Sequence, residues 1–169
     1  MIKEIEILHS VISLLNLQLS DLNKDSECEE YSGYNFKLNQ FSIKFRKAKV
    51  TPKKTGQFVT LWKRNPETKE TEPFTDQDSF DFYIIITEYK NQSGFFFFRK
   101  DILAKKNIIT SSLKTGKRGF RIYPDWDLPE NKQAISTQKW QTQFFINLSD
   151  KENDIIPKLN KILITNNLH

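Results

Sequence analysis

Apolar residues near the start of the chain recur at steps of three and four positions. They are Ile5, Leu8, Ile12, Leu15 and Leu19. This spacing places them along one face of an amphipathic helix. Three further helices are expected: a short one over Arg99–Lys106, one from about Asn131, and a last one over Glu152–Asn166 with Pro157 near its start.

Short apolar runs bounded by turn residues predict β-strands. They lie over Tyr31–Leu38, Phe41–Val50, Gln57–Arg64, Phe80–Thr87, Phe95–Phe98 and Phe120–Tyr123. Two of them, Gln57–Arg64 and Phe80–Thr87, are apolar on both faces, which is typical of central strands covered by other layers. The pattern predicts an α+β fold, with a central mixed β-sheet flanked by helices. We expect one domain over residues 1–169, in which residues 151–169 form a C-terminal helical extension.

The strand over Phe41–Val50 has an irregular end. Its first half alternates apolar and polar residues, as a strand with one buried face does. If that alternation continued, Lys47 and Lys49 would point into the core. Either a β-bulge reverses the strand near Arg46, or the two lysines line a cleft at its end.

Composition removes several classes of site. The 169 residues include one cysteine, Cys28, and two histidines, His9 and His169. These numbers exclude an internal disulfide and argue against a histidine-based zinc site or a Ser-His-Asp triad. Glu4 and Glu6 interrupt the apolar pattern of the N-terminus, and no apolar run is long enough to span a membrane. We expect a cytoplasmic protein with no cofactor, no metal and no membrane partner.

Positive charge is concentrated in two segments without acids. The segment 43–64 holds eight lysines and arginines, and the segment 114–121 holds four. Because the whole chain has a formal charge of +5, the rest of it carries −7, with acids gathered in Asp21–Glu30 and Glu67–Asp81. Such segregation favours a surface that binds a polyanion, although lysine-rich strands exposed to solvent give the same pattern.

Three motifs resemble those of the MepB family. They are TPKKTGQFVTLWKR at 51–64, GKRGFRIYPDWD at 116–127 and NKQAISTQKWQ at 131–141. The resemblance runs from about Tyr31 to Phe145, and the two acid-free basic segments coincide with the first two motifs. The family consists of bacterial cytoplasmic proteins, and its namesake is encoded beside a multidrug efflux pump and the repressor of that pump. The resemblance implies a core similar to restriction endonucleases and an activity of nucleic-acid binding.

The sequence and the resemblance together give a set of candidate nucleic-acid-binding residues. They are Lys47, Lys49, Lys54, Gln57, Lys63, Arg64, Lys117, Arg118, Arg121, Tyr123, Trp126, Gln133 and Gln141. The cations would neutralise phosphates, Tyr123 and Trp126 would stack on unpaired bases, and the glutamines would contact base edges or simply cap strand ends. Trp62 and Trp140 are expected in the core. The exposed basic and aromatic residues favour DNA, and single strands over duplex.

Two alternatives remain. A metal-dependent nuclease would need an Asp beside an acid that lies two residues before a lysine, and Glu88-Tyr89-Lys90 has this spacing. The nearest upstream acid, Asp81, lies about 23 Å away if the intervening chain is extended, and it is more simply interpreted as a strand-end carboxylate that pairs with a basic residue such as Arg121. The third class is a small-molecule or protein-binding accessory of drug efflux, for which the genetic neighbourhood of the family's namesake is the sole support.

Overall fold

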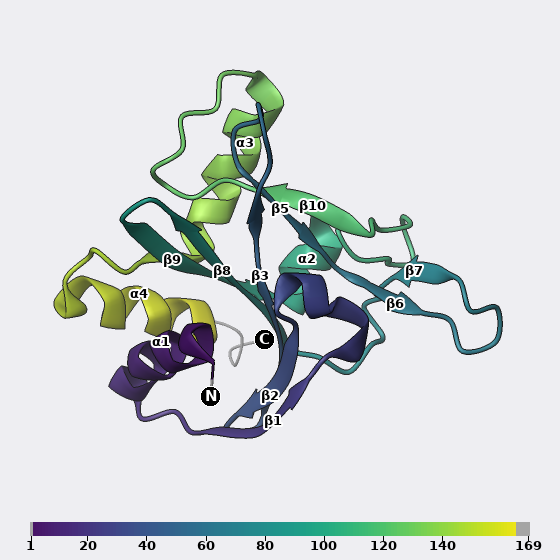
Figure 1. Cartoon of the computed structure of the whole chain (residues 1–169), viewed down its shortest axis with the longest axis horizontal. Coiled ribbons are helices and arrows are strands. Elements are labelled where there is room, and N and C mark those ends of the chain that lie inside the picture. The colour runs from purple at the N-terminus through teal and green to yellow at the C-terminus, as the bar shows by residue number, and fades with distance from the viewer. Residues whose placement is uncertain (1, 165–169) are drawn as a thin grey trace.

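A six-stranded mixed β-sheet forms the centre of the computed structural model, which describes residues 2–164 (Figure 1). The order of its strands is β1-β2-β3-β8-β9-β11. Their bounds are Leu19–Lys24 for β1, Tyr34–Leu38 for β2, Phe41–Lys47 for β3, Phe82–Tyr89 for β8, Gln92–Arg99 for β9 and Phe145–Asn147 for β11. Because β3 and β8 are parallel while the other neighbours are antiparallel, the sheet is mixed, as the sequence predicts.

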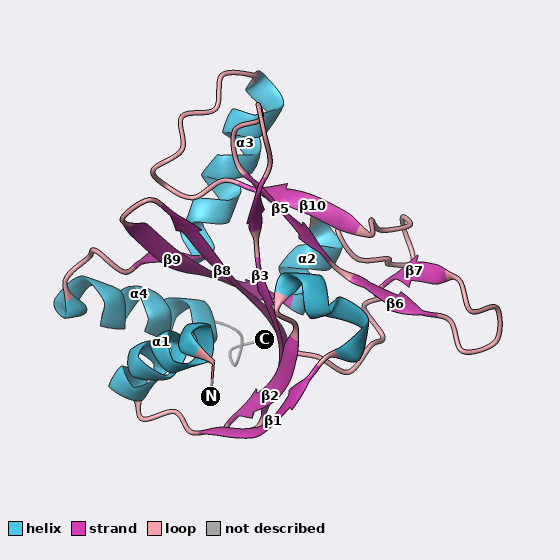
Figure 2. Ribbon diagram, in the orientation of Figure 1, coloured by secondary structure: helices cyan, strands magenta, loops and turns pink. Residues whose placement is uncertain are grey.

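Two helices cover one face of this sheet. They are α1 (Lys3–Ile12) and α4 (Glu152–Ile164), which lie side by side against it in Figures 1 and 2. Ile5 and Leu8 of α1 and Leu159 of α4 are fully buried in one apolar cluster with β2, β3, β8 and β9. The segment expected as a C-terminal extension therefore supplies half of a layer of the core. Asn166 and His169 lie outside the described residues.

The other face of the central sheet packs against a second cluster of elements. A three-stranded sheet of order β10-β5-β4 lies there, with bounds Gly119–Ile122, Gln57–Thr60 and Lys49–Val50. The helices α2 (Lys100–Lys105) and α3 (Lys132–Gln141) and the hairpin of β6 (Trp62–Arg64) with β7 (Thr71–Pro73) complete this side. Phe96 and Phe98 on one side of β9 belong to this second cluster, whereas Phe95 and Phe97 belong to the first. Both faces of β9 and of most of β8 are thus buried, which confirms the prediction for Phe80–Thr87.

Three sequence predictions of secondary structure are wrong in detail. Leu19 begins a strand rather than ending the first helix, because the helix stops at Ile12 and a 3₁₀ turn with left-handed Asn16 reverses the chain. The acidic segment Asp21–Glu30, for which the sequence predicts a loop, instead holds the end of β1 and most of a 3₁₀ segment over Ser26–Tyr31. The predicted strand Gln57–Arg64 is divided at Leu61, because β5 pairs with β10 whereas β6 pairs with β7 in a separate hairpin.

The predicted strand Phe41–Val50 is also divided, and it contains no bulge. The pairing of β3 with β8 runs without a shift from Ile43 to Lys47. The chain then crosses at buried Ala48 into β4 of the second sheet. Arg46, predicted on a wet face, is 1% exposed, since that face of β3 lies under the second cluster.

None of the helices within residues 2–164 has the length and apolar character needed to cross a bilayer.

Candidate nucleic-acid interface

Two adjoining cavities lie between β10 and α3. One has a volume of about 410 Å³ and the other about 360 Å³, and both are lined by Arg121, Tyr123, Asn131 and Ala134. We call them together the β10–α3 groove. Its floor comes from β5 and β10, one wall from α3, and one end from the loop 51–56. The groove thus joins residues from all three motifs that the sequence singled out.

The charged lining of the groove is almost entirely positive. Its cations are Lys53, Lys54, Lys106, Lys117 and Arg121, and its one acid among the lining residues is Glu130. Within residues 2–164, no acidic side chain lies within ion-pair distance of Lys53, Lys54 or Lys117. Unpaired ammonium groups around a concave surface attract anions.

Gln141 attaches α3 to the free edge of β10. It is fully buried, its Oε1 accepts the backbone N–H of Tyr123, and its Nε2 donates to the carbonyl of Arg121. The side-chain amide thereby replaces a neighbouring strand along this edge. Gln138, one turn earlier, donates to the carbonyls of Pro124 and Asp127. The Asn131 side chain caps the start of the helix by accepting the N–H of Ala134.

Arg121 holds the loop 51–56 in place at the end of the groove. Its guanidinium donates to the carbonyls of Thr55 and Gly56 and to the hydroxyl of Thr51. Gly56 has a φ of 81°, and a Cβ there would lie 2.7 Å from the ring of Tyr123. Only glycine fits this close approach. The loop is therefore fixed, and it presents Lys53 and Lys54 outward.

Aromatic side chains contribute to the groove between these charges. Phe58, Tyr123 and Trp140 line it and are each half-buried, so one side of each ring system packs on the protein. The Lys106 ammonium lies 5.3 Å from the centre of the Trp140 ring. Trp140, expected in the core, packs against buried Phe98 with 5.5 Å between the ring centres, and it also forms part of the wall of the groove, as its neighbours Thr137 and exposed Gln133 do.

One carboxyl beside the groove has a strongly raised pKa. Burial raises the pKa of Asp127 to about 6, and the nearby charge of Arg121 opposes this only partly. Asp127 belongs to the loop before α3, where its backbone carbonyl accepts from Gln138. Protonation of this carboxyl below about pH 6 removes a negative charge near the groove.

The structure gathers six of the predicted site residues around the groove. They are Lys54, Lys117, Arg121, Tyr123, Gln133 and Gln141. Arg121 and Gln141 hold the groove together: the Nε and Nη2 groups of Arg121 bind the loop 51–56, and both polar atoms of Gln141 bind the edge of β10. Of the two interpretations given for the glutamines, the contacts of Gln141 fit the one in which the side chain caps a strand, and not the one in which it contacts base edges.

Four of the other predicted cations are paired with acids elsewhere. Lys47 Nζ lies 2.8 Å from Glu4 and 3.1 Å from Glu88. Lys63 lies 2.9 Å from Asp78. Lys49 lies 3.9 Å from Glu30, and Arg64 lies 3.6 Å from Glu27 while it stacks on Trp62, which is half-buried rather than in the core.

Three remaining predicted residues also lie outside the groove. Arg118 donates to the carbonyl of Thr71, and so connects β10 to β7. Gln57 is buried, with its Nε2 donating to the carbonyl of Glu88. The ring of Trp126 lies 5.5 Å from that of Phe145 in a T-shaped arrangement, its Nε1 is buried, and it lines neither cavity of the groove.

The carboxylates considered for a nuclease do not meet. Asp81 precedes β8 and accepts the backbone N–H of Ser42, while Glu88 lies at the far end of β8 beside Lys47. The predicted pairing of Asp81 with Arg121 is wrong, because Arg121 is bound to the loop 51–56. No three His, Cys, Asp or Glu side chains in the part of the chain that the structure describes are grouped as metal ligands.

Sequence reasoning missed two cations and two rings of the groove, and one of the rings is Trp140. Lys53 lies in the first basic segment and could have been included on charge alone. Lys106 follows α2, and Phe58 alternates with buried residues of β5. No local signal in the sequence marks Lys106 or Phe58, since the packing of α2 and α3 around β10 brings these two residues to the groove.

Comparison with known proteins agrees with this architecture. A family model described as MepB-like matches residues 25–147. The chain belongs to the MepB-like family. The crystal structure of MepB superposes with a TM-score of 0.77 at 32% identity, covering 89% of this chain and 100% of that one. A bacterial homing endonuclease, I-Ssp6803I, superposes with a TM-score of 0.45 at 11% identity, covering 81% of this chain and 86% of that one. No curated protein matches the sequence.

Of the helices that cover the first face of the sheet, α1 precedes the residues matched by the MepB-like model and α4 follows them. The three motifs and the whole of the β10–α3 groove lie inside the matched range.

Proposed function

We propose that the β10–α3 groove binds nucleic acid, DNA in single-stranded form in preference to duplex, and that it does so without catalysis. The observation that carries this proposal is the set of lysines around the groove that have no acidic partner, namely Lys53, Lys54 and Lys117. Most other basic residues of the same sequence segments lie within ion-pair distance of an acid.

The lysines supply the attraction. Each ammonium group that approaches a phosphate releases condensed counterions, which favours binding at low salt and makes affinity fall steeply as salt rises. A lysine acts as a point charge without fixed geometry, so this attraction does not depend on base sequence. The proposed interaction is therefore general in character.

The half-buried rings supply the preference for single strands. Tyr123 has one side against Gly56 and lines both cavities. An unpaired base stacked on such a ring contributes about 1–3 kcal/mol, whereas a duplex keeps its bases within its own stack. Gln133, exposed on the wall of α3, offers an amide that both donates to and accepts from a base edge.

Fluorescence anisotropy with labelled single-stranded and duplex oligonucleotides over a salt series tests this proposal. We expect tighter binding of the single strand at about 50 mM salt, where the electrostatic attraction is strong. The variants Lys54→Ala and Lys117→Ala should each weaken binding and reduce the salt slope by about one. Lys24→Ala is the matched control, because Lys24 is exposed on β1 and lines neither cavity of the groove.

Absence of binding to either oligonucleotide at low salt overturns the proposal. Equal losses in the Lys24 variant and the two groove variants would show that attraction to total charge, and not the groove, is responsible.

A further inference from the structure

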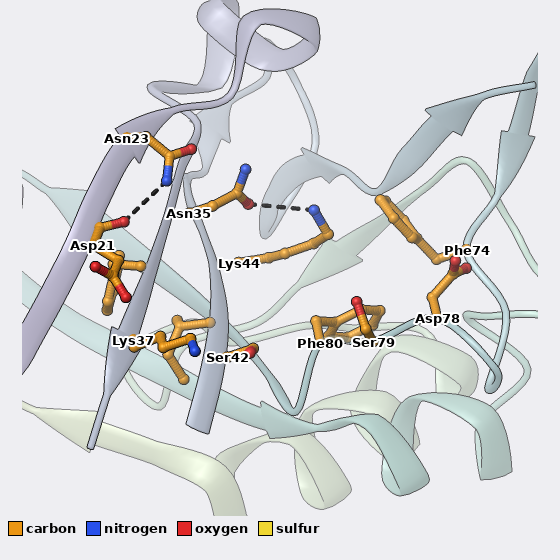
Figure 3. Close-up of a pocket in the computed structure, with 12 residues that line it drawn as sticks. Asp21, Asn23, Asn35, Lys37, Ser42, Lys44, Phe74, Asp78, Ser79 and Phe80 are labelled. Carbon is orange, nitrogen blue, oxygen red and sulfur yellow. Dashed lines mark hydrogen bonds between the residues drawn. The ribbon is translucent and has the colours of Figure 1, made fainter. Parts of the chain in front are cut away.

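A separate pocket lies on the opposite end of the central sheet from α3. It has a volume of about 300 Å³, and Figure 3 shows side chains from β1, β2, β3 and the segment 74–80 around it. The residues that matter for its chemistry are Asn35, Lys37, Ser42, Lys44, Phe74 and Phe80. None of them lines the β10–α3 groove.

The pocket exists because one face of the first three strands is polar. Phe36 of β2 and Ile43 and Phe45 of β3 alternate toward the core under α1 and α4. Asn35 and Lys44, which are paired across the two strands, therefore project from the opposite face. The segment 74–80 closes the pocket from the side with Phe74 and Phe80 (Figure 3).

The side chains behind Lys44 form a network with more positive than negative charge. Arg46 is 1% exposed and donates to Asp25, and Lys44 Nζ lies 3.9 Å from the same carboxylate oxygen. Burial alone would raise the pKa of Asp25, but the charges of Arg46 and Lys44 hold it below its usual value. Two cations thus share one carboxylate, and the nearer of them is Arg46.

Two acids, Asp21 and Asp78, also line the pocket, and Asp78 attracts Lys44 from beyond ion-pair distance. Asp78 accepts from Lys63 at 2.9 Å and from the backbone N–H of Thr75 at 2.7 Å, so both of its oxygens are in use. Asp21 is an exposed residue of β1. Lys37, exposed on β2, adds a further positive charge at the edge of the pocket.

Lys44 also has hydrogen-bonding capacity to spare. Its one hydrogen bond is to the Oδ1 of Asn35 at 3.2 Å, and its ammonium lies 4.7 Å from the centre of the Phe74 ring. An ammonium has three N–H groups. The Nδ2 of Asn35 makes no hydrogen bond within residues 2–164, so it is a second donor in the same place.

We propose that this pocket binds a small organic anion, a molecule with a phosphate or carboxylate group on a compact apolar body. The anionic group receives hydrogen bonds from Lys44 and the Asn35 amide, with Lys37 nearby, and it completes the charge balance of the Arg46–Asp25–Lys44 network. The apolar body packs against Phe80. A pocket of about 300 Å³ is at the small end of ligand sites and exceeds what inorganic phosphate fills.

Titration of the ¹⁵N-labelled protein with phenyl phosphate, benzoate and inorganic phosphate, followed by NMR, tests the proposal. We expect both aromatic anions to shift the Asn35 side-chain amide and the Ser42 backbone amide, with inorganic phosphate binding more weakly. Lys44→Met should weaken phenyl phosphate binding by about tenfold or more, as expected for loss of a charge-assisted hydrogen bond. Lys24→Met, on neighbouring β1 and outside the pocket, should leave binding unchanged.

A second variant keeps the test valid if Lys44→Met does not fold. Asn35→Asp replaces the amide donor by a carboxylate oxygen and puts a negative charge 3.2 Å from the Lys44 ammonium, so it repels the anionic group of the ligand. We expect it to abolish binding of phenyl phosphate with no loss of thermal stability.

Unchanged affinity in Asn35→Asp overturns the proposal, as does an absence of shifts at Asn35. Shifts confined to Gln133 and Tyr123 would show that the anions bind in the groove. That result overturns the proposed ligand site in the pocket and supports anion binding by the groove. If an oligonucleotide shifts the NMR signals of Asn35 and the small anions do not, the pocket binds nucleic acid and the proposal of a small ligand is wrong. Failure of oligonucleotide binding alone leaves this proposal intact.

Discussion

The basic residues on β3 and β6 have different surroundings from the lysines around the β10–α3 groove that come from the same two acid-free segments. Arg46, Lys47 and Lys63 each contact at least one carboxylate, whereas Lys53, Lys54 and Lys117 contact none within residues 2–164. The acids that pair with the first group come from other elements: Asp25 precedes the 3₁₀ segment, Glu4 lies on α1, and Asp78 follows β7.

The difference shows that a count of charges along the chain overestimates the charge available for binding. A paired cation stabilises the contact between two elements, and its removal changes the free energy of unfolding. An unpaired cation in a concave surface is free to attract a ligand, and its removal changes affinity and its salt dependence. The same substitution should therefore give opposite results in the two regions.

The largest effect is expected from Arg46→Met. This change leaves Asp25 without its nearest partner in a mostly buried place and removes the donor to the Phe45 carbonyl. Breaking a buried pair in this way lowers the free energy of unfolding by about 3–5 kcal/mol. Urea unfolding followed by circular dichroism measures the loss.

The matched control for that experiment is Lys54→Met, at an exposed position without a carboxylate partner. Its stability should stay within about 0.5 kcal/mol of the unmodified protein. Comparable losses in the two variants would contradict the division between paired and unpaired cations.

The next largest effect concerns the wall of the groove. Gln141→Leu removes both hydrogen bonds to the edge of β10 and leaves the N–H of Tyr123 and the carbonyl of Arg121 without partners. Each unsatisfied buried group costs about 1–3 kcal/mol, so we expect a loss of about 2 kcal/mol or more in unfolding experiments, together with weaker oligonucleotide binding. Gln143→Leu, on an exposed side chain two residues later, is the control. If both variants behave alike, the amide of Gln141 does not hold the groove.

The sequence predicts the parts of this molecule that depend on local pattern. The helices α1, α2 and α3 begin near their expected residues, and buried β8 and β9 follow from their continuous apolar runs. Breaks at Ala48 and Leu61 were missed, because strand division depends on which sheet the chain joins. The partner of Arg46 lies 21 residues earlier, and no spacing rule connects the two.

The β10–α3 groove and the pocket of Figure 3 could be predicted from the sequence to different degrees. Six of the residues predicted from the sequence line the groove. They could be predicted because the motifs that form the groove combine charged with aromatic residues. The pocket of Figure 3 was missed entirely. Its polar residues alternate with apolar ones on β2 and β3, and this pattern is the same as that of strands with one face in solvent. Only the placement of the segment 74–80 turns that face into a pocket.

A smaller effect, dependent on pH, is expected at Asp127. Its folded-state pKa of about 6 exceeds the ordinary value, so the folded protein binds a proton between about pH 4 and pH 6 that the unfolded chain has released. The contribution of this carboxyl to stability is therefore fully present below pH 4 and is lost as pH rises through 6. Asp127→Asn should raise the melting temperature at pH 7 and leave it unchanged at pH 3.5, as measured by thermal unfolding at both values.

An equal shift of the melting temperature at both pH values would contradict the raised pKa of Asp127. Such a shift would come from a change in packing or hydrogen bonding, which is the same at both pH values. Glu130→Gln provides the comparison: it removes an acid from the same loop at an exposed position.

The smallest effect is expected where the motif is basic but the side chain is paired. Lys63 belongs to the same motif as Lys54, yet it lies 2.9 Å from Asp78 and 3.9 Å from Glu72, and it lines neither cavity of the groove. Lys63→Met should leave oligonucleotide affinity and its salt slope unchanged, while stability falls by about 1 kcal/mol or less, as for other partly exposed ion pairs. Lys54→Met removes the same charge and should lower both affinity and slope. Anisotropy measured for the two variants side by side compares them at equal net charge. Equal losses of affinity would mean that pairing within the fold does not remove a lysine from the binding surface.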